Sequence, residues 1–357
     1  MKAALLCGPC PPGACGVGDY TICLARALNQ KGVEAHVIST GEWNLLGSVR
    51  RYERSGTKFD ILHIQYPTFG FGWTLFPQVL ALVRRSVVTI HEASRAHILR
   101  KLALLPFGIR PRRVVFTSEC ERQFAMKWVP WISRVSCVIP VPSNISAFEG
   151  QSDRSLDEIL YFGLIMPKKG LENVIALAEL VKASGLSFRI RIMGSSPPKH
   201  AAYFEELKSK TSTLPIIWDH ELSEQQVAKR LASSSIAYLP YPDGVSERRG
   251  TFKAALLNGV TVITTRGQDT PSSFGDLVSF CSNPEEALAA ARFLSGNAEQ
   301  RTRLVDSARR YARQFTWDSI AEDHLVLYRH ILGAKYNRER IALRSPEPGN
   351  HLDSKSV

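Results

Sequence analysis

Short runs of apolar residues alternate with amphipathic stretches along most of this chain, and the series occurs twice. Runs rich in Val and Ile that are apolar at nearly every position predict strands buried on both faces, as in a parallel sheet. Helical periodicity in most of the intervening stretches predicts an α/β fold of two doubly wound, Rossmann-like domains that face each other across a cleft. The predicted strands cover residues 2–7, 34–39, 60–66, 86–92, 112–118 and 135–141, then 158–165, 187–194, 215–220, 235–241, 260–265 and 277–282.

The domain boundaries follow from the break between the two series. At 357 residues the chain is long enough for two α/β domains. A polar segment rich in turn residues separates the series, and a terminal amphipathic stretch begins after Thr316, a plausible N-cap. The predicted units are an N-terminal domain (1–145), a linker (146–157), a C-terminal domain (158–315), a terminal helix (316–334) and a disordered tail (335–357).

The positive charge of the chain is concentrated in its first half. The formal net charge is +12, and residues 1–145 hold 18 Lys and Arg against 8 Asp and Glu. Such an excess favours an anionic partner. Nucleic acid, a membrane surface and a phosphate-bearing small molecule all fit, as does a solvated basic face without a partner.

Hydropathy and cysteine content indicate the cellular compartment of the protein. No segment reaches the roughly 20 consecutive apolar residues that a membrane-spanning helix needs. Seven cysteines spread over a long chain do not form the pattern of a secreted disulfide framework. We therefore expect a cytoplasmic protein.

Three of the cysteines lie close together near the N-terminus, in the stretch CGPCPPGACGVGDY. Cys7, Cys10 and Cys15 supply three thiolates, but no clustered fourth Cys or His follows, whereas strong zinc sites pair two such knuckles. A metal or redox centre is therefore the minor alternative, and we predict no metal site.

The glycines that follow these cysteines lie between a predicted strand and a predicted helix. Gly16, Val17, Gly18 and Asp19 stand where a tight backbone turn leads into free helical N–H groups, which can hold an anion. A simple strand-to-helix turn is the alternative.

In doubly wound sheets ligands bind beyond the carboxyl ends of the strands, so the residues after each apolar run are candidates. His91 directly follows a strand, where it could hydrogen-bond a substrate, whereas His63 lies inside a strand and is predicted to be a core residue. Gly163 ends a strand of the second series, and Lys169 precedes the next helix, well placed for phosphate oxygens.

Residues 246–251, with the sequence SERRGT, open a predicted helix of the second domain. Arg248 and Arg249 beside free helical N–H groups make a strong anion site. Glu247 could accept hydrogen bonds from sugar or ribose hydroxyls. The alternative is a solvated capping cluster in which Glu247 pairs with its own two arginines.

These motifs, in this order, resemble the retaining glycosyltransferases of family four, which have the two-domain GT-B fold. The resemblance covers roughly residues 1–332 and rests on PPGACGVGDYTICLARAL, VVTIHE, VIPVPSNI, YFGLIMPKKGLENVI, YPDGVSERRGTFKAALLNGVTVITT and FTWDSIAEDHLVLYRHIL. It implies sugar transfer from a nucleotide-sugar donor, held by the C-terminal domain, to an acceptor held mainly by the N-terminal domain. It also implies that no metal or cofactor serves the leaving diphosphate, and that the final helix crosses back to the first domain.

The resemblance assigns roles to individual residues. Lys169 matches the lysine that contacts donor phosphates, and His91 matches the histidine near the reacting sugar. Glu247 fits the first glutamate of a paired-glutamate motif if one residue is deleted before the helix. The predicted sites are therefore His91 and Glu247 (catalytic), Gly163, Lys169, Arg248, Arg249, Gly250 and Thr251 (donor), and Gly16, Val17, Gly18 and Asp19 (loop over the cleft, acceptor side).

Two positions depart from the pattern of that family. Leu164 stands where an arginine usually follows the glycine, and Ala254 stands where the second glutamate usually binds the ribose. These changes leave the identity of the donor undetermined. They also support an alternative, a non-catalytic relative that binds a nucleotide sugar or a partner protein.

The basic excess bears on the acceptor. Residues 94–113 interleave Arg and Lys with Ile, Leu and Phe and contain no acid, and Trp128 and Trp131 follow nearby. This composition is typical of a membrane-surface segment or an anionic-acceptor site. We expect peripheral binding at the inner face of the membrane and a glycan or lipid-linked acceptor in polysaccharide or glycolipid assembly, with no role for nucleic acid. A soluble enzyme with a basic rim is the alternative.

Overall fold

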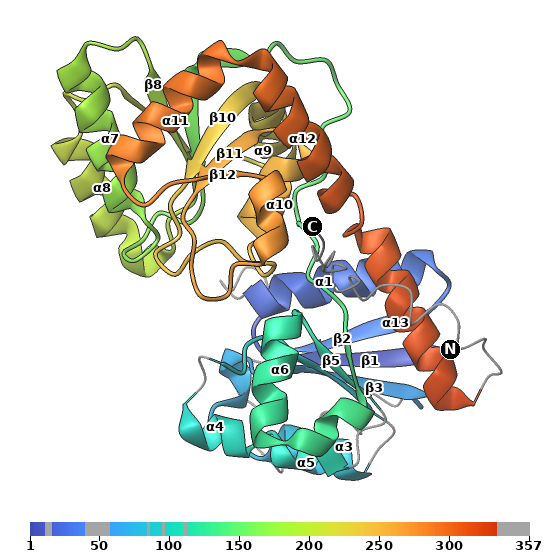
Figure 1. Ribbon diagram of the computed structural model, residues 1–357. Helices are drawn as coiled ribbons and strands as arrows, with labels where there is room; N and C mark the ends of the chain where they lie inside the picture. Colours follow the sequence, from blue (N-terminus) through green and yellow to red (C-terminus); the bar gives the residue numbers. More distant parts are fainter. Residues whose placement is uncertain (11–15, 40–57, 84–85, 95–96, 110–112, 334–357) are drawn as a thin grey trace, which may run out of the picture.

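The computed structural model describes residues 1–10, 16–39, 58–83, 86–94, 97–109 and 113–333 of the chain. Within these residues it contains two six-stranded sheets with helices packed around them (Figure 1). Neighbouring strands pair in parallel throughout both sheets. The predicted two-domain α/β fold is confirmed, while the predicted tail, residues 335–357, lies outside the described residues.

The first sheet has the strand order β2-β1-β3-β4-β5-β6. Its strands are β1 (Lys2–Cys7), β2 (Glu34–Ser39), β3 (Ile61–Tyr66), β4 (Ser86–Ile90), β5 (Arg113–Phe116) and β6 (Ser136–Val138). Each lies within one of the six apolar runs of the first series. β3 is buried at all six positions, as expected for a central strand covered on both faces.

Helices cover the two faces of the first sheet with separate cores. The described helices are α1 (Gly16–Gln30), η1 (Phe69–Phe71), α3 (Phe76–Val83), α4 (Ile98–Leu102), α5 (Leu105–Ile109), α6 (Glu119–Trp128) and η2 (Pro130–Arg134). Residues of α3, α5 and α6 pack with the sheet in one core, and residues of α1 pack on the other face.

The second sheet has the order β12-β11-β10-β7-β8-β9. Its strands are β7 (Ser155–Phe162), β8 (Arg189–Gly194), β9 (Ile216–His220), β10 (Ser234–Leu239), β11 (Thr261–Thr264) and β12 (Ser279–Phe280). β7 begins three residues before the predicted start of the C-terminal domain at residue 158. The apolar signal starts later because β7 opens with Ser-Leu-Asp, in which two of the three residues are polar and none is fully buried.

The helices of the second domain surround this sheet and share one large core. They are α7 (Leu171–Ser184), η3 (Pro198–His200), α8 (Ala201–Lys210), α9 (Glu224–Ala232), α10 (Gly250–Leu257), η4 (Ser272–Asp276), α11 (Pro284–Gly296) and α12 (Ala298–Ala312). The stretch over 246–251 thus opens a helix as predicted, with α10 beginning at Gly250.

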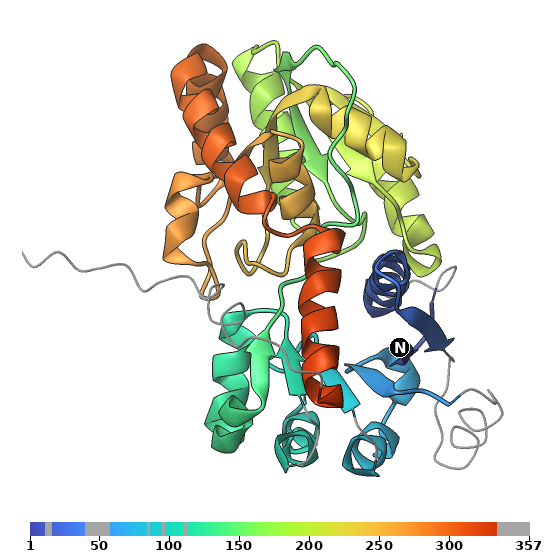
Figure 2. The same cartoon turned by 90° about the vertical axis from the view of Figure 1, so that its right-hand side faces the viewer.

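The last described helix, α13 (Trp317–Leu332), returns to the first domain, as Figure 2 shows. Thr316 is its N-cap, as predicted, and accepts a hydrogen bond from the backbone N–H of Ser319 at 3.1 Å. Residues of α13, among them Ile320 and Tyr328, pack with α1 in the core of the first domain. The chain therefore ties its two domains together a second time.

Buried histidines lie where α13 meets the first sheet. Nδ1 of His63 lies 2.6 Å from the Tyr328 hydroxyl, and its Nε2 lies 2.7 Å from the Thr89 hydroxyl. The His63 and His324 rings are 5.3 Å apart. Burial lowers the pKa of His63 well below its usual range and that of His324 to about 4, so both rings are neutral at pH 7. His63 is a satisfied core residue, as predicted.

This cluster makes stability depend on pH. The unfolded chain takes up protons near pH 6.5 at these histidines, but the folded chain does so only at lower pH, so acid favours unfolding. We expect the free energy of unfolding, measured in urea, to be highest above about pH 7 and to fall as the pH drops toward 5. The contribution of His324 to this fall should be on the order of 1 to 2 kcal/mol. His324→Gln should flatten this slope, whereas His97→Gln, at an exposed site, should leave it unchanged. An unaltered slope in His324→Gln would show that its ring is not held neutral.

Candidate functional site

The carboxyl ends of the strands carry most of the residues predicted to be functional. His91 follows β4, Gly163 follows β7, and Glu247 lies in the loop between β10 and α10. Because all strands within a sheet are parallel, these loops gather at one edge of their sheet, where doubly wound folds bind ligands.

Some loops of the second domain approach each other so closely that only glycine fits at the points of contact. A Cβ atom on Gly194, the last residue of β8, would lie 1.8 Å from the carbonyl oxygen of Gly163. Gly170 has a φ of 81°, and a Cβ on it would lie 1.9 Å from the carbonyl oxygen of Pro240. The turn that carries Lys169 is therefore fixed against the loop that leads from β10 to Glu247.

Lys169 lies in a turn with unusual backbone geometry. Its neighbours Lys168 and Gly170 have φ values of 64° and 81°, both left-handed. The Tyr161 hydroxyl donates a hydrogen bond to the Lys169 carbonyl at 3.1 Å. Helix α7 begins at Leu171, so Lys169 lies two residues before the first free helical N–H groups.

Arg248 joins the two domains. Its guanidinium donates to the Glu121 carboxylate, forms an ion pair with Asp269 at 3.1 Å, and lies 3.8 Å from a Glu92 oxygen. The Glu121 side chain is only 2% exposed and that of Arg248 16%. Glu121 also accepts hydrogen bonds from the backbone N–H groups of Ala93 (2.7 Å) and Ser94 (2.9 Å). One carboxylate thus fixes both the loop after β4 and an arginine of the opposite domain.

Arg249 is engaged within its own domain. It donates to the Asp243 carboxylate, and its guanidinium lies 4.8 Å from the centre of the Tyr241 ring. The Tyr241 hydroxyl in turn lies 2.8 Å from that of Thr251. The arginines predicted to bind phosphate therefore both face carboxylates in this structure, a competition that the sequence did not indicate.

Glu247 is partly buried, and this burial raises its pKa while nearby Lys253 lowers it. Among the ion pairs of the described residues, none joins Glu247 to Arg248 or Arg249. The alternative of a capping cluster, in which Glu247 pairs with its own arginines, is therefore wrong. The arginines find their partners elsewhere because the fold brings Glu121, Asp269 and Asp243 closer to them.

Lys253 is a buried residue that was not among the predicted site residues. Its ammonium group donates to the Val141 carbonyl and lies 4.6 Å from the centre of the Phe315 ring. Burial lowers its pKa to about 8. A lysine within the otherwise apolar run 252–257 was the available signal. Lys253 connects α10 to both segments that pass between the domains.

His91 is held by contacts from three elements. Its Nε2 donates to the side-chain oxygen of Gln65 at 2.8 Å, and its ring lies 4.9 Å from that of Tyr20, edge to face. Its carbonyl accepts from the Thr117 hydroxyl at 3.2 Å. Burial, aided by His324, lowers its pKa to about 3. The imidazole is therefore neutral, and with its proton on Nε2 it can accept a hydrogen bond at Nδ1.

The predicted cleft loop lies at the start of α1. Gly18 is buried, and a Cβ on it would lie 2.2 Å from the Pro9 carbonyl oxygen, so the helix start packs against the segment that follows β1. Asp19 has its pKa raised by burial and then by Glu224, which belongs to α9 of the second domain. The first turn of α1, with Gly16 and Val17, thus faces across the domain boundary.

The cysteines do not form a metal site in the part of the chain that the structure describes. The sulfur atoms of Cys7 and Cys10 lie 3.3 Å apart, and Cys15 lies outside the described residues. No group of three or more His, Cys, Asp or Glu residues with a metal-binding arrangement occurs among the described residues. None of the described helices is long and apolar enough to cross a membrane.

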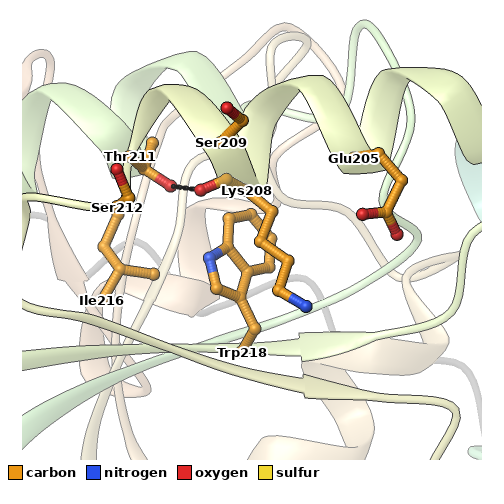
Figure 3. Close-up of a pocket in the computed structure, with 7 residues that line it drawn as sticks. All are labelled: Glu205, Lys208, Ser209, Thr211, Ser212, Ile216 and Trp218. Atoms are coloured by element: carbon orange, nitrogen blue, oxygen red, sulfur yellow. Dashed lines mark hydrogen bonds between the residues drawn. The ribbon is translucent and has the colours of Figure 1, made fainter.

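A pocket of about 410 Å³ lies away from the predicted site, between α8 and β9 (Figure 3). Its walls include Lys208 and Thr211 of the helix end, with Trp218 beneath them. Ile216 begins β9, so this pocket is near the amino end of that strand. We do not assign the site to it, because ligands of this fold bind at the opposite edge of the sheet.

Solved structures share the fold of this chain, although no family model and no curated protein sequence matches it. Sucrose-phosphate synthase from Thermosynechococcus elongatus has a TM-score of 0.73 at 16% identity, covering 94% of this chain and 100% of that one. A glycosyltransferase from Rickettsia africae has 0.71 at 15%, covering 94% and 99%. HepE of Anabaena, solved with UDP and glucose, has 0.68 at 14%, covering 91% and 98%. The predicted GT-B fold is confirmed.

The contact between Arg248 and Glu121 predicts strong energetic coupling. Arg248→Met leaves a buried carboxylate without its cation and should lower the free energy of unfolding by about 3 kcal/mol. Glu121→Gln in the same chain should recover part of that loss, giving a coupling energy of about 1 to 3 kcal/mol in a double-mutant cycle. The exposed Lys210–Glu206 pair is the control, with a coupling below about 1 kcal/mol. Additive effects at 121 and 248 would contradict the interdomain contact.

Proposed function

We propose that this chain, whose fold is that of the GT-B glycosyltransferases, transfers a sugar with retention from a nucleotide-sugar donor to an acceptor hydroxyl. The observation that carries the proposal is the meeting of loops from opposite domains. Through Arg248, the loop that follows His91 touches the loop that opens α10, and Lys169 lies in the turn fixed against the same region. A neutral imidazole and a phosphate-binding lysine would thus flank one cleft.

On the donor side, two helix N-termini and cationic side chains would hold the diphosphate. α7 begins beside Lys169, and α10 begins at Gly250, with Arg249 as its N-cap and Thr251 in its first turn. Their free N–H groups and positive charges stabilise the oxygens on which charge develops as the sugar leaves. This set of groups needs no metal ion, and Gly163 leaves space for the close packing of the turn.

On the acceptor side, the start of α1 and His91 would frame the reacting hydroxyl. The acceptor oxygen would form the new bond to the anomeric carbon on the face from which the nucleoside diphosphate departs, and its proton would pass to the leaving phosphate oxygen. His91 would accept a hydrogen bond from a sugar hydroxyl at Nδ1. Glu247, with its raised pKa, would contact hydroxyls of the donor.

The two departures from the family pattern have structural correlates. Leu164 is 44% exposed, so an apolar side chain stands where an arginine would reach the donor. Ala254 is fully buried in the core of the second domain, so no side chain at that position can bind a ribose. These observations support the second candidate, a non-catalytic relative that binds a nucleotide sugar or a partner protein.

We further propose that the acceptor is a glycan or lipid-linked glycan used in polysaccharide or glycolipid assembly. The protein would then work in the cytoplasm at the inner face of a membrane, and it would not bind nucleic acid in this role.

Lys169→Ala should weaken binding of a nucleoside diphosphate at least tenfold, because it removes a direct phosphate contact. The measurement is isothermal calorimetry with a panel of nucleoside diphosphates and their sugars. Lys168→Ala, at the exposed neighbouring residue, is the matched control and should bind like the parent protein. Equal affinities of the two variants would show that Lys169 does not contact the diphosphate.

His91→Ala should separate the two candidate functions. In a transferase it should lower acceptor-dependent release of nucleoside diphosphate at least 100-fold with little change in donor affinity. The pKa of His91 is about 3, which lies below the range from pH 5 to 9. His91 should therefore add no inflection to the pH–rate profile in that range. Donor binding without transfer by the parent protein, unchanged in His91→Ala, would support the binding relative instead.

A further inference from the structure

The first domain exposes an unusual number of large apolar side chains. Nine of the eleven exposed large hydrophobic residues in the described part of the chain lie between Trp73 and Trp131; the other two are Leu164 and Phe293. Trp73 is 67% exposed, Leu99 56% and Ile109 69%. Isolated exposed hydrophobic residues are ordinary, but a concentration of them in one part of a domain marks an interaction surface.

These side chains are linked into one surface by contacts between their elements. The Arg100 guanidinium of α4 lies 5.3 Å from the centre of the Trp73 ring, and the Lys101 ammonium lies 5.9 Å from that of Trp128, at the end of α6. A Cβ on Gly108 of α5 would lie 2.8 Å from Nε1 of Trp131. We call this surface, formed by residues 73–75, 98–102, 108–109 and 127–134, the apolar–basic face.

The charge around the apolar–basic face has one sign. Residues 61–148 contain eleven Lys and Arg but only three acids, Glu92, Glu119 and Glu121. All three acids are engaged elsewhere: Glu92 and Glu121 face Arg248 at the domain boundary, and Glu119 pairs with Arg122 at 3.2 Å. Lys127 and Arg134 on the face therefore have no carboxylate from this segment beside them.

We propose that the apolar–basic face docks on an anionic lipid bilayer. Tryptophans and aliphatic side chains enter the headgroup region while Lys and Arg contact lipid phosphates, each basic residue adding about 1 kcal/mol at the surface. A second copy of this chain fits the face poorly, since two faces of the same positive charge repel. A membrane with anionic lipids offers an apolar layer for the exposed hydrophobic side chains and negative charge for the Lys and Arg side chains.

The position of the face is suited to a lipid-linked substrate. α3 and α5 lie at the end of the molecule opposite the second sheet in both views (Figures 1 and 2). Helix α6 carries Glu121, at the contact with Arg248, in its first turn and ends at Trp128 on the face, and the backbone between these two residues rises by about 10 Å. Docking would hold the domain boundary about that far above the headgroups. This last step rests on the proposed function, whereas the docking itself does not.

The test is flotation of the full chain with vesicles of phosphatidylcholine, alone or mixed with phosphatidylglycerol. We expect binding to the anionic vesicles only, weakened at least tenfold when salt rises from about 0.1 M to about 1 M. Leu99→Ser with Lys127→Glu should weaken it at least tenfold. The matched control is Phe293→Ser with Arg292→Glu, an exposed pair on the second domain that should float like the parent.

Two outcomes would overturn the proposal: no flotation with anionic vesicles, or equal binding by the face variant and its control. A dimer in solution, detected by light scattering and dissociated by the Leu99→Ser and Lys127→Glu changes, would assign the face to a second copy instead. Thermal unfolding of each variant, with and without nucleoside diphosphate, checks the fold and the donor site separately. If the chain floats with anionic vesicles but binds no nucleotide, the docking proposal would stand and only the proposed function would be contradicted.

Discussion

All strands described in the two sheets run parallel to their neighbours, and this constraint decides where chemistry can occur. A parallel strand cannot be followed by a tight hairpin, so each connection within a sheet leaves at the carboxyl edge, and those that the structure describes pass through a helix before the next strand. Loops of unrelated sequence therefore collect at one edge of each sheet. His91, Lys169 and Glu247 are far apart along the chain, yet each occupies such an edge.

The domain boundary is held by buried charge. Glu121 and Arg248 come together over 127 residues of sequence, and Lys253 reaches Val141 over 112. Each group depends on its partner to offset the cost of leaving water. α13 adds a contact of another kind, with Tyr328 placed against His63 inside the first domain. Polar groups with fixed partners thus specify how the domains meet, while apolar cores stabilise each domain by itself.

The sequence predicted the elements better than it predicted the contacts. Continuous apolar runs located the strands, because a strand covered on both faces has no polar side; β7 was misplaced at its start, where it is not covered. Thr316 was found because capping is local, and the buried His63 because its strand is central. By contrast, the partners of Arg248 and Arg249 could not be predicted, since they depend on loops that meet only after folding.

The position of Arg248 has a consequence for any phosphate that enters the cleft. Arg248 already faces Glu121, Asp269 and Glu92, so these carboxylates offset its positive charge, and a diphosphate gains its full attraction only when Arg248 leaves at least one of them. After that departure Glu121 would retain hydrogen bonds from two backbone N–H groups and from the Ser94 hydroxyl at 2.6 Å, which offset part of the cost of leaving its carboxylate without a cation. Under the proposed function, donor binding and the Arg248–Glu121 contact would compete for one guanidinium. Such coupling is reciprocal, so the donor would loosen the domain contact by the same free energy with which that contact weakens donor binding.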